Sequence, residues 1–221
     1  MKIRTLLCLV LLPFALTTFA QQSFDDETDF LNAIEADFFF EDFSSISPGP
    51  AVSISFGPVN GYSYTVSSAP GSTSDLFNDP GVISLDNAGD QLRFTFTGAP
   101  VTAFGGNIFA TDISFNPITA TMTITLDDGS SFSFATSTST TFAGWVSDGT
   151  PIAFIDIDAD AGATNAWPSV ASFYVGTASD EGEPEIPEAV AVPTLSAAGL
   201  WLTIALALML GLFMLRRTGR V

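Results

Sequence analysis

The sequence predicts an all-β fold: an antiparallel two-sheet sandwich, jelly-roll-like, with one short N-terminal helix, followed by a single C-terminal transmembrane helix. Two observations predict this class. Six segments alternate apolar residues with small polar ones, which is the period of a strand with one buried face. A run of 21 uncharged residues near the C-terminus is long enough to cross a membrane as a helix. An up-and-down barrel is the alternative arrangement of the strands.

Turn signals separate the alternating segments at short intervals. The segments are residues 51–56, 61–66, 91–96, 118–126, 131–134 and 152–157. Asp127-Asp128-Gly129 joins two of them directly, and because Asp-Gly is typical of tight β-turns, a hairpin is expected there. Phenylalanine-rich inner faces and Ser/Thr-rich outer faces favour two packed sheets.

Residues 1–20 are organised like a secretory signal peptide. Two basic residues precede an uncharged segment, 5–16, and the small-residue pattern Thr18-Phe19-Ala20 follows it. Cleavage after Ala20 makes Gln21 the expected mature N-terminus. Cleavage would also remove Cys8, the only cysteine, so the exported part is expected to fold without disulfides.

A short helix is expected between Ser23 and Ala36. Acidic residues lie at its start, between Asp25 and Asp29, where they face the positive end of the helix dipole. Apolar residues at 30, 31 and 34 then share one face. The segment is therefore predicted to be amphipathic and to pack on the sandwich.

The uncharged run extends from Leu195 to Leu215 and is followed by Arg216, Arg217 and Arg220. A buried core helix rarely has this length without a polar face, so a membrane-spanning helix is predicted. Because arginines concentrate on the cytoplasmic side of a span, the C-terminus is expected in the cytoplasm. Everything before Val192 is then expected outside.

The tail combines a short motif, Val192-Pro193-Thr194-Leu195, with the apolar run and the terminal Arg216-Arg217. This arrangement resembles the IPTL-CTERM sorting signal, a relative of the PEP-CTERM signals on exported bacterial surface proteins, with Val where that family usually has Ile. The resemblance implies recognition in the membrane by an exosortase-type cysteine peptidase that cuts near the motif. A single-pass anchor that is never cut is the alternative.

A second resemblance covers residues 100–176. The matching stretches are Phe-Gly-Gly-Asn at 104–107 with Thr-Asp at 111–112, the hairpin at 127–129, Phe-Ala-Gly-Trp at 142–145, the strand at 152–157 and Phe-Tyr-Val-Gly at 173–176. They resemble the β-sandwich of exported PEP-CTERM-type proteins, which implies a fold and a surface location but no established activity. The chain departs from that pattern at 170–172, where it has Val-Ala-Ser in place of paired aspartates.

Gly105 and Gly106 stand inside a predicted strand. Glycine weakens a strand interior, so its presence indicates a β-bulge or a close approach of another backbone. A structural role is therefore expected for both residues.

The charge of the exported part is strongly negative. All 24 acidic residues of the chain lie between Asp25 and Glu188, and Arg93 is the only base between residues 21 and 193, which leaves a net charge of −23. Such a field repels nucleic acid, so no nucleic-acid partner is expected. Binding of cations is compatible with it.

Three carboxylates, Asp156, Asp158 and Asp160, alternate along one predicted strand and would share one face. Like charges side by side repel unless water or a cation separates them, and oxygen ligands suit Ca²⁺. These residues are the candidate calcium ligands, and a solvated acidic face is the other interpretation. An EF-hand is excluded because the loop's twelfth position is Trp167.

The chain offers little for catalysis. It has no histidine, and the exported part has neither cysteine nor lysine, so Ser-His-Asp, Cys-His and Ser-Lys mechanisms are excluded. A carboxylate pair such as Glu41 with Asp112 remains, supported by residue type alone. No enzymatic activity is predicted. Trp145, Trp167 and Tyr174 are the candidate ligand-binding aromatics, which could stack on sugars if they are exposed.

The predicted organisation has four parts. A signal peptide (1–20) precedes a β-sandwich ectodomain (21–178), an acidic proline-containing linker (179–191) and the sorting and transmembrane segment (192–221). The expected function is that of an exported surface or matrix protein, membrane-anchored or sortase-processed, whose sandwich is structural or adhesive. The alternative is a carbohydrate-binding module, and calcium bound at the three aspartates is a candidate for assisting it. The expected partners are the membrane, the peptidase and an extracellular polysaccharide.

Overall fold

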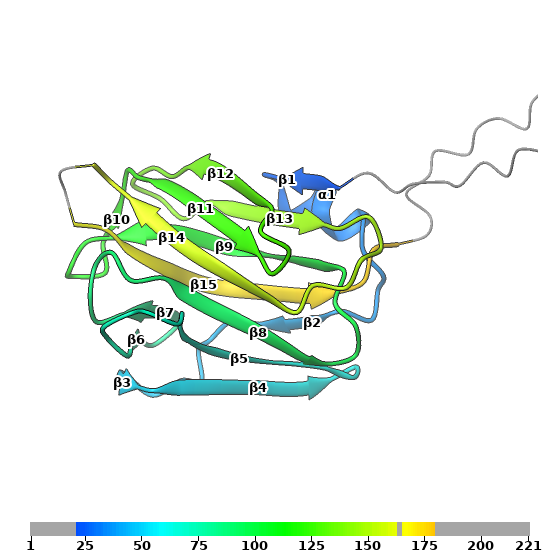
Figure 1. The fold of residues 1–221 in the computed structure, drawn as a ribbon, viewed down its shortest axis with the longest axis horizontal. Coiled ribbons are helices and arrows are strands. Elements are labelled where there is room, and N and C mark those ends of the chain that lie inside the picture. Colours follow the sequence, from blue (N-terminus) through cyan, green and yellow to red (C-terminus); the bar gives the residue numbers. More distant parts are fainter. Residues whose placement is uncertain (1–20, 163–164, 180–221) are drawn as a thin grey trace, which may run out of the picture. The chain divides into compact units, whose positions relative to one another are not determined.

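The computed structural model describes residues 21–162 and 165–179. Within these ranges the chain forms fifteen strands and one short helix (Figure 1). The strands lie in two antiparallel sheets, one of nine strands and one of six, whose facing side chains form a common core. The predicted all-β, two-sheet architecture is confirmed.

The six-stranded sheet has the order β12-β11-β14-β8-β5-β4. Its strands are β4 (Ser53–Val59), β5 (Tyr62–Ser68), β8 (Leu92–Gly98), β11 (Thr121–Leu126), β12 (Ser131–Ala135) and β14 (Phe154–Asp160). Each of the six alternating segments of the sequence overlaps one of these strands, although Ala51 belongs to β3 and Ile118 to β10 of the other sheet. Gly129, in the left-handed region at φ 84°, closes the expected hairpin between β11 and β12, where its N–H donates to the carbonyl of Leu126.

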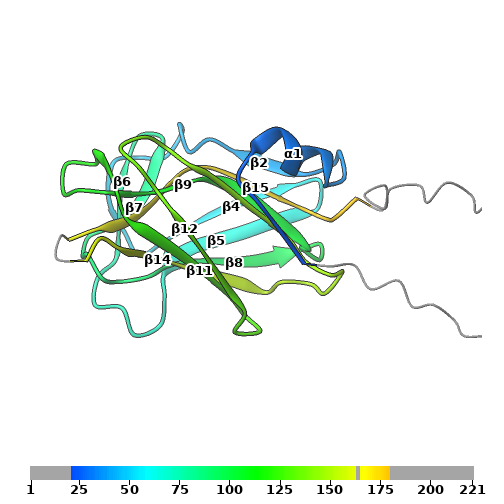
Figure 2. The same ribbon diagram turned by 90° about the horizontal axis from the view of Figure 1, so that it is seen from above.

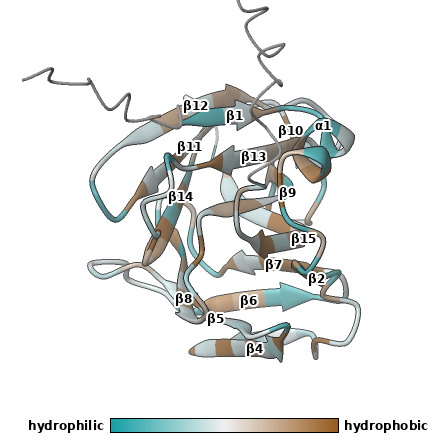
Figure 3. Ribbon diagram, turned by 90° about the vertical axis from the view of Figure 1, so that its right-hand side faces the viewer, coloured by the Kyte–Doolittle hydropathy of each residue, from teal (hydrophilic) through white to brown (hydrophobic). Residues whose placement is uncertain are grey.

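The outer face of this sheet carries many hydroxyl groups, with Arg93 and the aspartates of β14 among them. Pairs on neighbouring strands bond to each other, with 2.9 Å between the side-chain oxygens of Ser55 and Thr65, and likewise of Thr123 and Ser133. Apolar neighbours point the other way, into the core. Figure 3 shows the resulting alternation of hydrophobic and hydrophilic bands along the strands.

The nine-stranded sheet has the order β1-β13-β9-β15-β7-β6-β3, with β10 paired to β9 and β2 paired to β15. Its strands are β1 (Gln22–Phe24), β2 (Phe39–Glu41), β3 (Gly49–Ala51), β6 (Leu76–Asp79), β7 (Val82–Leu85), β9 (Ala103–Thr111), β10 (Pro117–Ile118), β13 (Phe142–Val146) and β15 (Trp167–Gly176). The two central strands, β9 and β15, are buried on both faces along most of their length.

Aromatic rings fill the space between the sheets. Tyr64, Phe94 and Phe173 are fully buried and in mutual contact, with ring centroids 4.3 to 5.7 Å apart. Each fully buried ring of this size stabilises the fold by roughly 2–3 kcal/mol. The core therefore joins β5 and β8 of one sheet to β15 of the other without disulfides.

Gly106 permits a close approach between β9 and β15. A Cβ atom at this position would lie 2.2 Å from the carbonyl oxygen of Ser172, which no side chain can tolerate. The register between the two strands shifts at the same place, between Val170 and Ser172. The predicted bulge or close approach at this glycine pair is confirmed.

The helix α1 (Glu27–Asn32) covers the outer face of the nine-stranded sheet, on the side away from β5, β8 and β14 (Figure 2). Asp26 caps it, because its carboxylate accepts hydrogen bonds from the N–H groups of Thr28 and Asp29. Phe30 is fully buried over Gly105 and Gly144, which lie opposite each other on β9 and β13. The predicted amphipathic helix is confirmed, with six residues.

No helix among the described residues is long and apolar enough to cross a membrane. The predicted span from Leu195 to Leu215, the signal peptide and most of the linker lie outside those residues. The described chain ends with Ala178 and Ser179 hydrogen-bonded to the domain, through Thr102 and Ala33 respectively.

Candidate binding pocket beside Trp167

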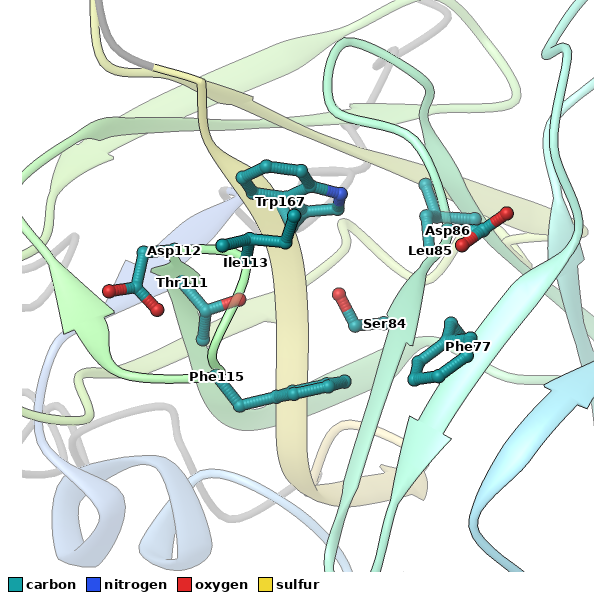
Figure 4. Close-up of a pocket in the computed structure, with 9 residues that line it drawn as sticks. All are labelled: Phe77, Ser84, Leu85, Asp86, Thr111, Asp112, Ile113, Phe115 and Trp167. Atoms are coloured by element: carbon teal, nitrogen blue, oxygen red, sulfur yellow. The ribbon is translucent and has the colours of Figure 1, made fainter.

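A small pocket lies on the outer face of the nine-stranded sheet, where β7, β15 and β9 run side by side. Its volume is about 160 Å³. The lining residues are Phe77, Ser84, Leu85, Asp86, Thr111, Asp112, Ile113, Phe115 and Trp167 (Figure 4). Two cross-strand pairs frame it, Phe77 with Ser84 and Thr111 with Trp167. Their side chains face outward because the neighbouring Ile83 and Val170 belong to the core.

Two hydroxyl groups that line the pocket, those of Thr111 and Ser84, are linked by the buried hydroxyl of Ser169, which completes a row of three with one group from each strand. The side-chain oxygens of Thr111 and Ser169 are 2.9 Å apart, those of Ser169 and Ser84 are 3.0 Å apart, and Ser84 donates to the carbonyl of Pro168 at 3.1 Å. Each hydroxyl has one proton, so Ser169 donates either to Ser84 or to the carbonyl of Trp167 at 3.3 Å, and in both arrangements Thr111 is the donor to Ser169. The oxygen of Thr111 is then the acceptor at the open end of the row.

The loop between β9 and β10 forms one wall and is held by Asp112. Its carboxylate accepts hydrogen bonds from the N–H groups of Ser114 and Asn116 and from the Asn116 side chain. These bonds, the one from the Asn116 side chain foremost, hold the pKa of Asp112 below its usual value, so the group is ionised at neutral pH.

Phe115 occupies the left-handed region at φ 60°, which is unfavourable for an aromatic residue. This conformation places its ring parallel to that of Phe77, with 6.1 Å between centroids and 28° between planes. Figure 4 shows Thr111 and Ser84 between the Trp167 indole on one side and these two rings on the other. Strained residues of this kind concentrate at ligand sites.

The pocket therefore combines apolar aromatic walls with hydroxyl groups and two carboxylates, Asp86 and Asp112. It is smaller than the roughly 300–1,000 Å³ of typical small-molecule pockets, so it fits one ring of a ligand better than a large cofactor. None of its lining residues carries a positive charge. The chemistry suits a neutral, hydroxyl-rich molecule with an apolar face.

The three predicted ligand aromatics do not share a surface. Trp167 lines the pocket. Trp145 is half-buried and stacks on Phe132 at 4.8 Å, on β13 and β12. Tyr174 is only 7% exposed, and its hydroxyl donates to Glu27 of α1. Trp145 and Tyr174 are thus packing residues in this structure, because β13 and β15 carry them against neighbouring aromatic side chains.

The three candidate calcium ligands share the outer face of β14, as the alternation predicts. Asp156, however, forms an ion pair with Arg93, while Asp158 and Asp160 accept the N–H groups of Ala159 and Gly162. In the part of the chain that the structure describes, no three acidic side chains gather closely enough to hold a metal ion. The extended strand spaces them along its length instead.

Glu41 and Asp112 are too far apart to act as a glycosidase pair. Glu41 lies opposite Phe173 on β15, whereas Asp112 follows Thr111, which lies opposite Trp167. Six residues at ~3.3 Å each separate these points by about 20 Å. Paired glycosidase carboxylates lie about 5 to 9.5 Å apart.

The sorting motif, Val192 to Leu195 with Arg216 and Arg217, lies outside the described residues. Sequence reasoning missed Phe77, Phe115 and the Ser84–Ser169–Thr111 row. A partial signal was present, since Asp112 and Asn116 are typical turn residues and Thr111 ends the Phe-Gly-Gly-Asn stretch. These residues lie close together only because β7 pairs with β15, and no local sequence pattern reveals that pairing.

Comparison with known proteins gives no further identification. The chain matches no family model, and it matches no curated protein. The interpretation of the pocket therefore rests on its own geometry.

Proposed function

We propose that the chain is an exported surface protein whose β-sandwich, of jelly-roll-like topology, is a non-catalytic adhesive domain. The signal-peptide pattern of residues 1–20 and the tail from Val192 support export and retention at the membrane. In this proposal the tail is either a permanent anchor or the substrate of an exosortase-type peptidase. The start of β1 and the segment that follows β15 lie at the same end of the sandwich, which leaves the opposite end free (Figure 1).

We infer further that the adhesive ligand is an extracellular saccharide and that the pocket beside Trp167 holds one of its rings. The aromatic walls supply a face for the apolar C–H side of a sugar. Thr111 and Asp86 supply acceptors for its hydroxyl groups. The negative charge of the domain favours neutral or cationic sugars over uronates, sulfates or phosphates. The arrangement of Trp167, Phe77 and Phe115 over the hydroxyl row is the observation that carries this proposal.

Glycan-array binding of the exported protein tests the ligand. Trp167→Ala should weaken binding to the preferred glycan at least tenfold, because it removes the largest wall of the pocket. Phe40→Ala is the matched control, since Phe40 is an exposed aromatic on β2, away from the pocket. A chelator should not change binding. Absence of any glycan ligand, or unchanged binding by Trp167→Ala, would contradict the saccharide proposal.

Mass mapping of the protein recovered from the cell surface tests export independently of the ligand. The mature N-terminus should be Gln21, and a retained Met1 would contradict export through a cleaved signal. A C-terminus near Val192 would indicate peptidase processing, whereas an intact Val221 would indicate a permanent anchor.

A further inference from the structure

The strands at the ends of the two sheet orders are β1, β3, β4 and β12, and they differ in how well they are protected against pairing with another strand. β1 and β3 have three residues each, and β3 contains Pro50. β4 contains Pro58 and an irregular register between Phe56 and Val59. Short strands, prolines and bulges are the usual means of preventing edge pairing. β12 has none of them, because its five residues include no proline, glycine or charge.

The backbone of β12 offers hydrogen-bonding groups along its free edge. Thr136 donates its N–H to Ala120, and Ser130 accepts from Leu126, so residues 130 and 136 face β11. The backbone N–H and C=O groups of successive residues point to opposite edges of an antiparallel strand. Those of Ser131, Ser133 and Ala135 therefore point away from β11. These are the groups that a further strand would bind.

The sequence of β12, Ser-Phe-Ser-Phe-Ala, is nearly the same in both directions. In an antiparallel pair of two β12 strands with Ser133 opposite Ser133, Ser131 lies opposite Ala135 and Phe132 lies opposite Phe134. All outward-directed backbone groups then meet, forming roughly six hydrogen bonds. The phenylalanines pair on the inner face and the serines on the outer face, as cross-strand pairing requires.

The side chains around this edge also favour a partner. Phe132 and Phe134 are half-buried and line a groove of about 590 Å³ between β12 and β13, together with Phe24 and Phe142. A second strand would remove part of this apolar surface from water.

β12 itself carries no charge, and Asp25 is the one charged residue that lines the groove beside it. Residues 136–141 are all serine or threonine. In the antiparallel arrangement, the hairpin acids Asp127 and Asp128 of one copy lie beside that uncharged segment of the other. Repulsion between the two acidic domains at longer range is screened beyond about 8 Å at physiological ionic strength.

We propose that β12 binds β12 of a second copy of this chain, which joins the two six-stranded sheets across a two-fold axis at Ser133. The symmetric, self-complementary contact is of the kind that closes as a dimer. The β12 contact involves none of the residues that line the saccharide pocket. An experiment that contradicts one of the two proposals therefore does not contradict the other.

A register-specific cross-link in the full chain tests the pairing. With Cys8→Ser as background, Ser133→Cys should form an intermolecular disulfide, because directly opposed hydrogen-bonded residues have Cα atoms about 5.5 Å apart. Ser131→Cys is the matched control, since the two copies of residue 131 would be offset by about 14 Å along the strands. Purely monomeric Ser133→Cys, or equal cross-linking of Ser131→Cys, would overturn the proposal.

Sedimentation of the full chain in detergent gives a second measurement. Ser133→Pro removes the outward N–H without removing a bond to β11 and should weaken dimerisation at least tenfold, whereas Ser133→Thr should leave it unchanged. Circular dichroism establishes that each variant is folded. A folded Ser133→Pro protein that dimerises like the unmodified chain would overturn the proposal, and if this variant does not fold, the cross-link decides.

Discussion

Arg93 and Asp156 face each other across β8 and β14 and form a two-point ion pair. The distance from Nε to Oδ1 is 2.7 Å, and that from Nη2 to Oδ2 is 2.6 Å. The guanidinium also lies over the ring of Phe154, 3.8 Å from its centroid. The two side chains are only 20% and 14% exposed, so neither can be removed without leaving a poorly solvated charge.

Arg93→Gln should therefore lower the free energy of unfolding by about 1–3 kcal/mol at neutral pH, because Asp156 keeps its charge and loses its partner. The double variant Arg93→Gln with Asp156→Asn should recover part of this loss. Urea denaturation followed by circular dichroism measures both. If the loss of unfolding free energy in the double variant equals the sum of the losses in Arg93→Gln and in Asp156→Asn, the two residues are not coupled.

Calcium should stabilise the unmodified protein no more than sodium chloride of equal ionic strength, because Arg93 already neutralises Asp156. Arg93→Gln should not create a calcium-specific stabilisation either, because β14 spaces its three carboxylates along the strand and no three acidic side chains of the described chain gather closely enough to hold a metal ion. In the Arg93→Gln background, Asp158→Asn should likewise leave the effects of calcium and of sodium chloride on the melting temperature equal. If calcium raised the melting temperature of the unmodified protein more than sodium chloride of equal ionic strength, the site predicted at Asp156, Asp158 and Asp160 would be supported.

Phe30→Ala should destabilise the protein by about 3–5 kcal/mol, because it empties the space that Gly105 and Gly144 leave for the ring. Gly144→Ala should also destabilise, by about 1–3 kcal/mol, since its Cβ would lie 2.7 Å from the Phe30 ring. Combining Gly144→Ala with Phe30→Leu should recover stability relative to Gly144→Ala. Thermal unfolding measures all three, and additive losses would show that the residues do not compete for one space.

Alkaline pH should destabilise the fold through Tyr64. Burial, reinforced by the negative charge of Glu41, raises the pKa of its phenol far above the usual 10.0. The unfolded chain ionises near pH 10 while the folded chain does not, so stability is complete below pH 10 and falls as pH rises above it.

Tyr64→Phe should reduce this alkaline loss. It should cost little near pH 7, because the Tyr64 hydroxyl is buried without a hydrogen-bond partner among the described residues. Urea midpoints from pH 7 to 11.5 provide the comparison. Parallel curves for the two proteins would contradict this account.

The sequence by itself predicted the strands of the six-stranded sheet, although not their order in the sheet. All six strands of that sheet alternate apolar and polar residues, since one face meets the core and the other meets water. The hairpin at Asp127-Asp128-Gly129 and the acidic start of α1 were likewise predictable, because turns and caps depend on neighbouring residues.

Only the tertiary structure decided the nine-stranded sheet and the pocket. β9 and β15 show no clear alternation because α1 and the loop after Thr111 cover their outer face, so residues on both faces are buried. The same applies to the aromatics: Trp145, Trp167 and Tyr174 have similar chemistry, and residue type cannot tell which is buried. The pocket exists because strand pairing brings Ser84, Thr111 and Trp167 together across 83 residues of chain, and such long-range register is set by the packing of the whole core.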